Sequence, residues 1–117
     1  MGPERDPRLH IRIDELTRLP LRSTFIDAAT ASIDMARASD QTLSLLVVDV
    51  DHFKLVNDTY GHLQGDDVLV EVAEILRRNL RGYDVAARYA GDEFVALLPN
   101  TPLEGATEVA ERICSAM

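Results

Sequence analysis

The sequence has a single cysteine, no excess of positive charge and no long apolar run, and each of these absences excludes a class of function. Because Cys114 is the only cysteine, no disulfide can form within the chain, and its neighbours Ala110 and Ile113 favour a buried or surface thiol over a nucleophile. The formal net charge of −8 argues against a nucleic-acid partner, since binding to a phosphate backbone needs a basic surface. No apolar run approaches the length of a membrane span, and residues 1–7 are too polar for a signal peptide. We therefore expect a soluble, cytoplasmic chain, although a longer parent protein could carry a membrane anchor elsewhere.

The length and composition predict one domain preceded by a short tail. A chain of 117 residues with 46% apolar composition can bury one core but not two. Residues 1–13 include two prolines and several charges, which indicates an N-terminal tail or the end of a linker. Residues 14–117 form the predicted domain, and they contain no internal repeat.

The first half of the domain predicts a helix followed by a buried strand. Apolar residues recur at helical spacing from Leu21 to Ala36, after Pro20, which suits a first helical turn, and this pattern ends near Asp40. Residues 43–50 are almost continuously apolar and rich in β-branched side chains, so we expect a strand that is covered on both faces and central in the sheet.

The second half predicts a helix, a β-hairpin and a final helix. Residues 68–80 have an apolar period near 3.6 and predict a long amphipathic helix. Two strand-like runs, residues 84–89 and 93–98, are joined by a short turn. Residues 101–104 have the form of a capping box with proline at the first helical position, and they predict the start of the last helix.

This order of elements predicts an α+β fold with a ferredoxin-like β-α-β-β-α core, in which the last strand of the full pattern is missing. In that topology the first strand is antiparallel to the third. The end of the first strand, at Asp49, should therefore lie beside the hairpin turn, at Asp92.

The two acidic segments that converge in this fold indicate a magnesium-nucleotide site. Asp49 and Asp92 offer the hard oxygen ligands that Mg²⁺ shares with phosphates. Ala90 and Gly91 are small enough to let the backbone approach a bulky anion. From these residues alone, a solvated hairpin turn and a capped strand end remain an alternative interpretation.

Three segments together carry a family resemblance. Residues 14–22 (DELTRLPLR), 49–66 and 88–94 (RYAGDEF) resemble the entry motif, the metal and guanine segment and the signature turn of the GGDEF domain family of diguanylate cyclases. The resemblance covers residues 14–117 and implies the fold shared by nucleotide cyclases and polymerase palms. It also implies that two GTP molecules, one on each subunit of a homodimer, condense to cyclic di-GMP with loss of two pyrophosphates. A sensor or regulatory domain is then expected on the N-terminal side in the parent protein.

The resemblance assigns the reaction centre to four residues. Asp49, the carbonyl of Val50 and Asp92 would hold Mg²⁺, or alternatively Mn²⁺. Asp49, Asp92 and Glu93 would be the catalytic residues, with Glu93 available for further metal binding or for proton transfer. These roles suit the attack of a ribose 3′ oxygen on an α-phosphate, which needs in-line geometry, charge neutralisation and help in deprotonating the hydroxyl.

The substrate-binding residues implied by the resemblance each have a simpler alternative. Lys54 would contact the triphosphate but could be a solvated lysine, and Asn57 and Asp66 would read guanine but could form a turn and cap a helix. His62 would line the same pocket or close a turn. The full predicted set is Lys54, Asn57, His62, Asp66, Ala90 and Gly91.

Arg81 and Asp84 fit the RxxD motif, which in the family marks an inhibitory site for the product, cyclic di-GMP. Arginine offers a bidentate fork to phosphate or guanine, and aspartate accepts hydrogen bonds from guanine. The alternative is a local contact between the two side chains at a helix end.

Two departures from the family pattern affect the expected function. Ala90 replaces the first glycine of the signature, so it would be strained if that position needs a positive φ. The sequence also stops at Met117, before the family's further strands, which would leave the first strand with an open edge and this piece poorly active. The alternative function is a weak or inactive GGDEF domain that binds GTP or senses cyclic di-GMP.

Overall fold

The computed structural model describes residues 13–117, so the expected tail over residues 1–13 lies almost entirely outside the described part. Within that part, the elements follow one another in the predicted order. Their bounds are α1 Arg22–Ser39, β1 Leu43–Asp49, α2 Phe53–Tyr60, α3 His62–Asn79, β2 Val85–Ala90, β3 Glu93–Pro99 and α4 Leu103–Ala116. No helix among residues 13–117 combines the length and the apolar character needed to cross a membrane.

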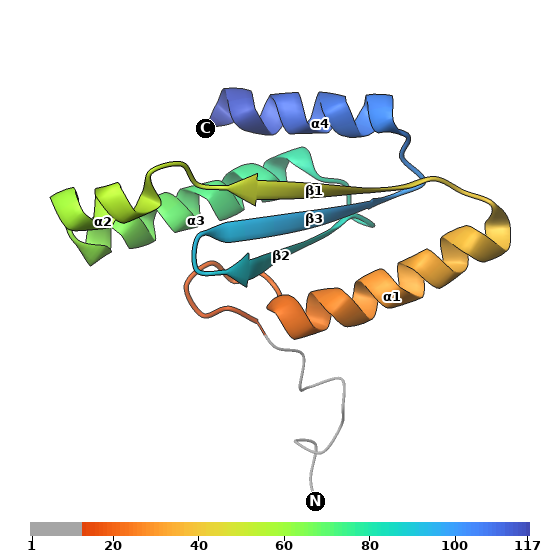
Figure 1. Cartoon of the computed structure of the whole chain (residues 1–117), viewed down its shortest axis with the longest axis horizontal. Helices are drawn as coiled ribbons and strands as arrows, with labels where there is room; N and C mark the ends of the chain where they lie inside the picture. Colours follow the sequence, from red (N-terminus) through yellow and green to blue (C-terminus); the bar gives the residue numbers. More distant parts are fainter. Residues whose placement is uncertain (1–12) are drawn as a thin grey trace, which may run out of the picture.

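The sheet is antiparallel, with the strands in the order β1, β3, β2 (Figure 1). β1 pairs with β3 in a continuous register from Leu43 opposite Pro99 to Asp49 opposite Glu93. β2 and β3 form the predicted hairpin. This arrangement confirms the predicted α+β class and the antiparallel relation between the first and third strands.

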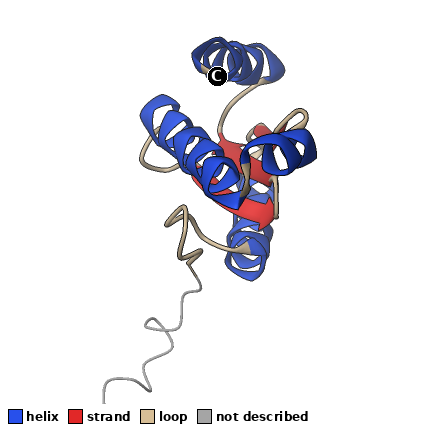
Figure 2. Cartoon of the chain, turned by 90° about the vertical axis from the view of Figure 1, so that its left-hand side faces the viewer, coloured by secondary structure: helices blue, strands red, loops and turns tan. Residues whose placement is uncertain are grey.

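β3 is the central strand, and its alternating side chains build a core on each face of the sheet. Phe94, Ala96 and Leu98 pack with buried residues of α3 and α4. On the opposite face, Val95 and Leu97 pack with Phe25 of α1. Figure 2 shows the helices on both sides of the sheet that this division requires. Because helices cover both faces of β3, the strand that follows the acidic turn is anchored from both sides.

The expectation that residues 43–50 form a central strand covered on both faces is wrong. β1 ends at Asp49 and lies at an edge of the sheet, and Leu45 and Val47 are 55% and 60% exposed. α1 packs against β2 and β3 on this face, which leaves the outer side chains of β1 uncovered. A continuous apolar run in the sequence is compatible with burial on both faces of a strand, but it does not show whether a helix reaches far enough to cover each face.

Two predicted helix starts also differ from the structure. Pro20 lies before α1, whose N-cap residue is Leu21. At α4 the N-cap residue is Pro102, and the hydroxyl of Thr101 donates to the Pro99 carbonyl instead of capping the helix. The capping box that residues 101–104 suggested is therefore not formed.

Candidate active site

The pairing of β1 with β3 brings the two acidic segments together, as the sequence predicted. Asp49 lies opposite Glu93 in the strand register, and the N–H of Val50 donates to the carbonyl of Asp92 at 3.2 Å. The Asp49 side chain is exposed, whereas Asp92 and Glu93 are half-buried. The strand pairing thus brings Asp49 close to the adjacent residues Asp92 and Glu93 at one end of the sheet, although 43 positions separate Asp49 from Asp92.

The oxygen atoms at this end of the sheet suit a hard cation that takes some of its ligands from the protein and the others from a bound substrate. Among residues 13–117, no group of three or more His, Cys, Asp or Glu side chains is arranged to hold a metal ion by itself. The carbonyl of Val50 accepts one hydrogen bond, from the N–H of Phe53 at 3.3 Å, and retains a second lone pair. Two carboxylates and a carbonyl match Mg²⁺, which commonly binds one or two protein carboxylates and takes its other ligands from phosphates and water.

The predicted guanine readers lie on two adjacent helices. Asn57 is in α2, and its Oδ1 atom is buried without a hydrogen-bond partner among the described residues. Its side chain packs on the buried Gly65 of α3, and Asp66 follows Gly65 directly. Asp66 lies inside α3, whose N-cap residue is Gly61, so Asp66 does not cap this helix. Asn57 likewise lies within a helix instead of forming a turn, and its side chain contacts the residue that directly precedes Asp66.

Lys54 and His62 are exposed at the same end of the molecule. Lys54 is 90% exposed, and its Nζ atom pairs with Asp58 at 2.9 Å one helical turn further along α2. His62 is the first residue of α3. Both side chains are accessible, and in the described part of the chain neither is hydrogen-bonded or ion-paired to Asp49, Asp92 or Glu93.

A cleft of about 730 Å³ opens beside the acidic edge, between β1, α3 and α4. Asp49 and Val50 line one end of it, but its other walls are largely apolar and include Leu46, Val72 and Ile113. Neither Asn57 nor Asp92 lines this cleft. The cleft therefore adjoins the candidate site but includes only part of it.

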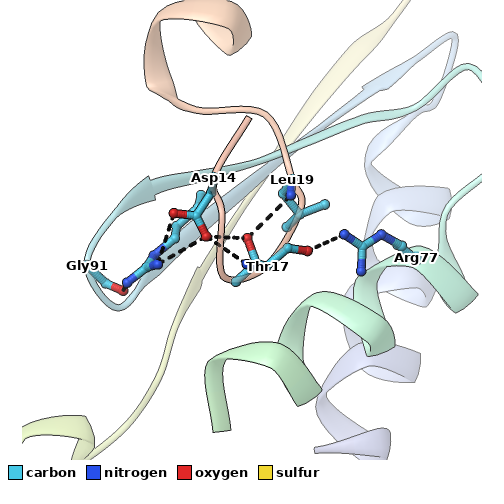
Figure 3. Close-up of polar contacts among 6 residues, drawn as sticks. Asp14, Thr17, Leu19, Arg77 and Gly91 are labelled. Carbon is cyan, nitrogen blue, oxygen red and sulfur yellow. Dashed lines mark hydrogen bonds and ion pairs between the residues drawn. The ribbon is translucent and has the colours of Figure 1, made fainter. Parts of the chain in front are cut away.

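The turn itself is held by the guanidinium of Arg88 (Figure 3). Its Nε and Nη2 atoms donate to the Gly91 carbonyl at 3.0 and 2.8 Å, and its Nη1 atom donates to both carboxylate oxygens of Asp14 at 3.1 Å. Asp14 Oδ2 also accepts hydrogen bonds from the N–H and the hydroxyl of Thr17, each at 2.8 Å. Burial alone would raise the pKa of Asp14, but the bonds from Thr17 and the charged Arg88 outweigh burial and hold that pKa below its usual value.

This cluster was missed at the level of sequence. Asp14 and Arg88 were included only as parts of two separate motifs, and 74 positions separate them. Gly65 carried a weak signal, since an isolated glycine inside a helical pattern often marks a close approach of another group. Neither pattern identifies the contacting partner.

Ala90 lies at the end of β2 without the strain that its sequence suggested. It is not among the residues with positive φ, and within the described chain Gly61 is the only glycine with positive φ. The exposed Ala90 side chain occupies an ordinary strand conformation next to the turn. The condition under which alanine would be strained here is therefore not met.

Arg81 and Asp84 contact each other in the structure. The backbone N–H of Arg81 and its Nε and Nη2 atoms donate to the Asp84 carboxylate at 2.7, 3.2 and 3.2 Å. The Asp84 side chain is only 1% exposed, whereas that of Arg81 is 44% exposed and lies over the ring of Tyr83. The hydrogen bond with Asp84 raises the pKa of Arg81 further above its usual value. The local contact that sequence offered as an alternative is thus present, and only the arginine offers an open face.

Comparison with known proteins assigns this arrangement to a family. Residues 11–117 match the family described as "Diguanylate cyclase, GGDEF domain". The chain belongs to the GGDEF domain family. This confirms the resemblance drawn from the three sequence segments.

Relatives and solved structures agree with this assignment. The GGDEF domain described here is 45% identical over 103 residues to diguanylate cyclase A of Treponema denticola, which covers 86% of this chain and 28% of that protein. It is similar to diguanylate cyclase SiaD of Pseudomonas aeruginosa, solved in complex with its activator SiaC, with a TM-score of 0.86, 42% identity and coverage of 92% of this chain and 41% of that one. It is also similar to the coiled coil and GGDEF domain of DgcB from Caulobacter crescentus, solved in complex with c-di-GMP, with a TM-score of 0.86, 34% identity and coverage of 92% and 56%. This chain thus spans about a quarter of the length of the curated relative.

Proposed function

We propose that this GGDEF domain condenses two molecules of GTP into cyclic di-GMP with release of two pyrophosphates. The observation that carries the proposal is the convergence of Asp49, Asp92 and Glu93 at the end of the β1–β3 ladder. The similarity to a protein named diguanylate cyclase supports the same reaction.

In the proposed mechanism the acidic end of the β1–β3 ladder would hold a cation. Asp49, the Val50 carbonyl and Asp92 would be the ligands of Mg²⁺, or alternatively of Mn²⁺, and the ion would neutralise charge on the phosphates. Glu93 accepts the proton of the ribose 3′ hydroxyl, or serves as a further metal ligand. Lys54 adds a positive charge for the triphosphate, and it can turn away from Asp58 at little cost because an exposed ion pair contributes about 1 kcal/mol or less.

The base of GTP is proposed to bind between α2 and α3. The buried Oδ1 atom of Asn57 has no hydrogen-bond partner among residues 13–117, and a guanine N–H would satisfy it. An acceptor that is costly to leave unpaired would then serve to recognise the base. Asp66 accepts from a second guanine N–H, and His62 borders the same pocket. Ala90 and Gly91 give the backbone room beside the phosphates.

One chain holds one such site, so the complete reaction needs two subunits that present two GTP molecules to each other. We therefore infer a homodimer in the active state. In a longer parent protein, a segment on the N-terminal side would control how the two sites meet.

Product inhibition through Arg81 is the proposed regulation. The exposed part of the guanidinium provides the donor fork for a phosphate or guanine of cyclic di-GMP, while the buried Asp84 fixes its orientation. Calorimetry should show binding of cyclic di-GMP that is lost in Arg81→Ala, and unchanged affinity in that variant would remove this site. A domain that binds cyclic di-GMP through Arg81 but makes none would correspond to the sensing alternative.

The reaction is tested by following cyclic di-GMP formation from GTP and Mg²⁺ by chromatography, in this chain and in the full natural protein. We expect Asp92→Ala and Glu93→Ala to lower the rate by about a hundredfold or more, as for other groups that stabilise developing charge. Glu104→Ala, at an exposed acid in the first turn of α4, is the control and should leave the rate unchanged. If the full natural protein binds GTP without forming product, the enzyme assignment fails and a nucleotide-binding module remains.

A further inference from the structure

The turn that carries Asp92 follows an irregular stretch of the hairpin. The register between β2 and β3 shifts between Arg88 and Ala90, and the ladder then closes with Ala90 opposite Glu93 on the two sides of the turn. A turn with small residues at Ala90 and Gly91 has few side-chain contacts of its own. Contacts from outside the hairpin can therefore add to the strand pairing that holds this turn.

Such contacts come from the segment that precedes α1. The backbone N–H of Arg88 donates to the Pro20 carbonyl at 2.9 Å, and Leu21 forms a parallel bridge with Arg88. The side chain of the same arginine reaches Gly91 on one side and Asp14 on the other (Figure 3). Arg88 is therefore tied to the entry segment through both its backbone and its side chain.

The bond to the Gly91 carbonyl has a direct effect on Asp92. A trans peptide is planar, and its C=O and N–H point in opposite directions. When Arg88 holds the Gly91 carbonyl towards itself, the N–H of Asp92 is aimed the opposite way. The guanidinium thus sets the orientation of the peptide that links the glycine to the first acid of the turn.

We propose that Arg88 and Asp14 are positioning residues for the acidic turn: Asp14 fixes the guanidinium of Arg88, and that guanidinium fixes the peptide between Gly91 and Asp92. The same entry segment is bonded to α3, because Arg77 donates to the Thr17 carbonyl, and α3 carries Asp66. One short segment before α1 thereby holds both the acidic turn and the helix of the proposed base site. The catalytic part of this inference rests on the proposed cyclase function.

The test separates local positioning from general stability by hydrogen exchange, measured residue by residue by NMR. The reporter amide is that of Val50, which donates to the Asp92 carbonyl, and the reference amides are those of Val95 and Leu97 in the middle of β3. In Asp14→Asn and Arg88→Lys we expect Val50 to exchange about tenfold faster or more, as after loss of a charge-assisted hydrogen bond, with the β3 amides unchanged. Asp34→Asn and Arg37→Lys, at exposed positions of α1, are the matched controls. Equal acceleration at all these amides, or none at Val50, would overturn the proposal.

A charge exchange sharpens the experiment. Asp14→Arg combined with Arg88→Asp restores an ion pair, but an aspartate at position 88 cannot donate to the Gly91 carbonyl. We expect the double variant to keep the fast exchange at Val50, whereas recovery of the slow exchange would show that the ion pair alone matters and would refute the role of the fork.

Activity measurements complete the test. If the full natural protein is a cyclase, Asp14→Asn and Arg88→Lys should lower kcat by about ten- to a hundredfold, the cost of a misplaced reacting group, in samples that remain folded. Wild-type rates in these variants despite faster exchange at Val50 would refute positioning. If the wild-type protein makes no product, the proposed function fails, while the exchange measurements still decide whether the entry segment holds the turn.

Discussion

Replacing Gly65 by alanine tests the proposed base site more sharply than removing a polar group, because the new methyl group would displace Asn57. A Cβ atom built on Gly65 would lie 1.8 Å from Oδ1 and 2.9 Å from Cγ of Asn57. Both distances are too short for non-bonded atoms, so the Asn57 side chain has to move away from its position between α2 and α3. Only glycine at position 65 leaves room for that amide.

The effect of Gly65→Ala on the free energy of unfolding follows from two opposing terms. Alanine stabilises a helix interior by about 1 kcal/mol relative to glycine, whereas overpacking a filled site costs about 1–3 kcal/mol. The net change should lie between about zero and 2 kcal/mol of destabilisation, measured by urea denaturation. Gly105→Ala in the first turn of α4 is the matched control, because its new Cβ would lie 3.2 Å from a methyl group of Thr101 and needs only a small shift.

The effect on binding is the decisive part. If Asn57 hydrogen-bonds guanine, its displacement removes one bond worth about 0.5–1.5 kcal/mol, which raises the Kd for GTP roughly two- to tenfold. Gly105→Ala should bind GTP like the wild type. A folded Gly65→Ala variant with wild-type affinity would refute the placement of Asn57 at the base, and a stability gain equal to that of Gly105→Ala would refute the clash.

Three further predictions concern the core, the entry segment and the sheet edge. Leu76→Ala, at a fully buried position of α3, should lower the free energy of unfolding, measured in urea, by about 2–5 kcal/mol. Leu63→Ala, at a position of the same helix that is 83% exposed, should change this free energy little. Similar losses of stability in the two variants would contradict the described core. Because the pKa of Asp14 is lowered in the folded state, its stabilising contribution is present above the unfolded value near 3.8 and is lost as the pH falls through the folded value. The stability difference between wild type and Asp14→Asn, measured at a series of pH values, should therefore vanish in acid, and a difference independent of pH would contradict the sign of the shift. Leu45→Lys with Val47→Lys should increase the monomer fraction of this chain in light scattering if the open β1 edge drives association, and an unchanged fraction would exclude that edge.

The sequence predicted the fold well because its strongest patterns are local. The helical periods of α1, α3 and α4 and the hairpin around Gly91 follow from apolar spacing and turn residues, and the observed elements match them within a few residues, except that α3 begins six residues earlier. The predicted position of β1 was wrong because an apolar run shows neither which strands lie beside it nor whether a helix covers each of its faces. The face of β1 that carries Leu45 and Val47 is open because of where α1 packs, which no property of the strand encodes.

The candidate site was predicted only as far as motifs extend. Asp49 and Asp92 could be brought together from topology, since antiparallel pairing fixes where strand ends meet. The contact between Asp14 and Arg88 depends on side-chain reach across 74 positions, and the fit of Asn57 against Gly65 depends on helix packing. The concern about Ala90 was conditional on a backbone angle, and the structure shows that this angle is not positive.

The edge position of β1 and the location of the acidic site are connected. β1 ends at Asp49 and, among residues 13–117, is hydrogen-bonded on one side only, by β3, which begins directly after Asp92. Within this part of the chain, a shift of β3 along β1 would therefore change the distance between the proposed metal ligands. Burial of β3 on both faces limits such motion within the sheet, and the contacts of Arg88 limit it at the turn. The geometry of the acidic site thus depends on two sets of contacts: the core on both faces of β3, and the bonds of Arg88 to the turn and to the entry segment before α1. Only the second set lies outside the core, so only it can be changed without disturbing core packing.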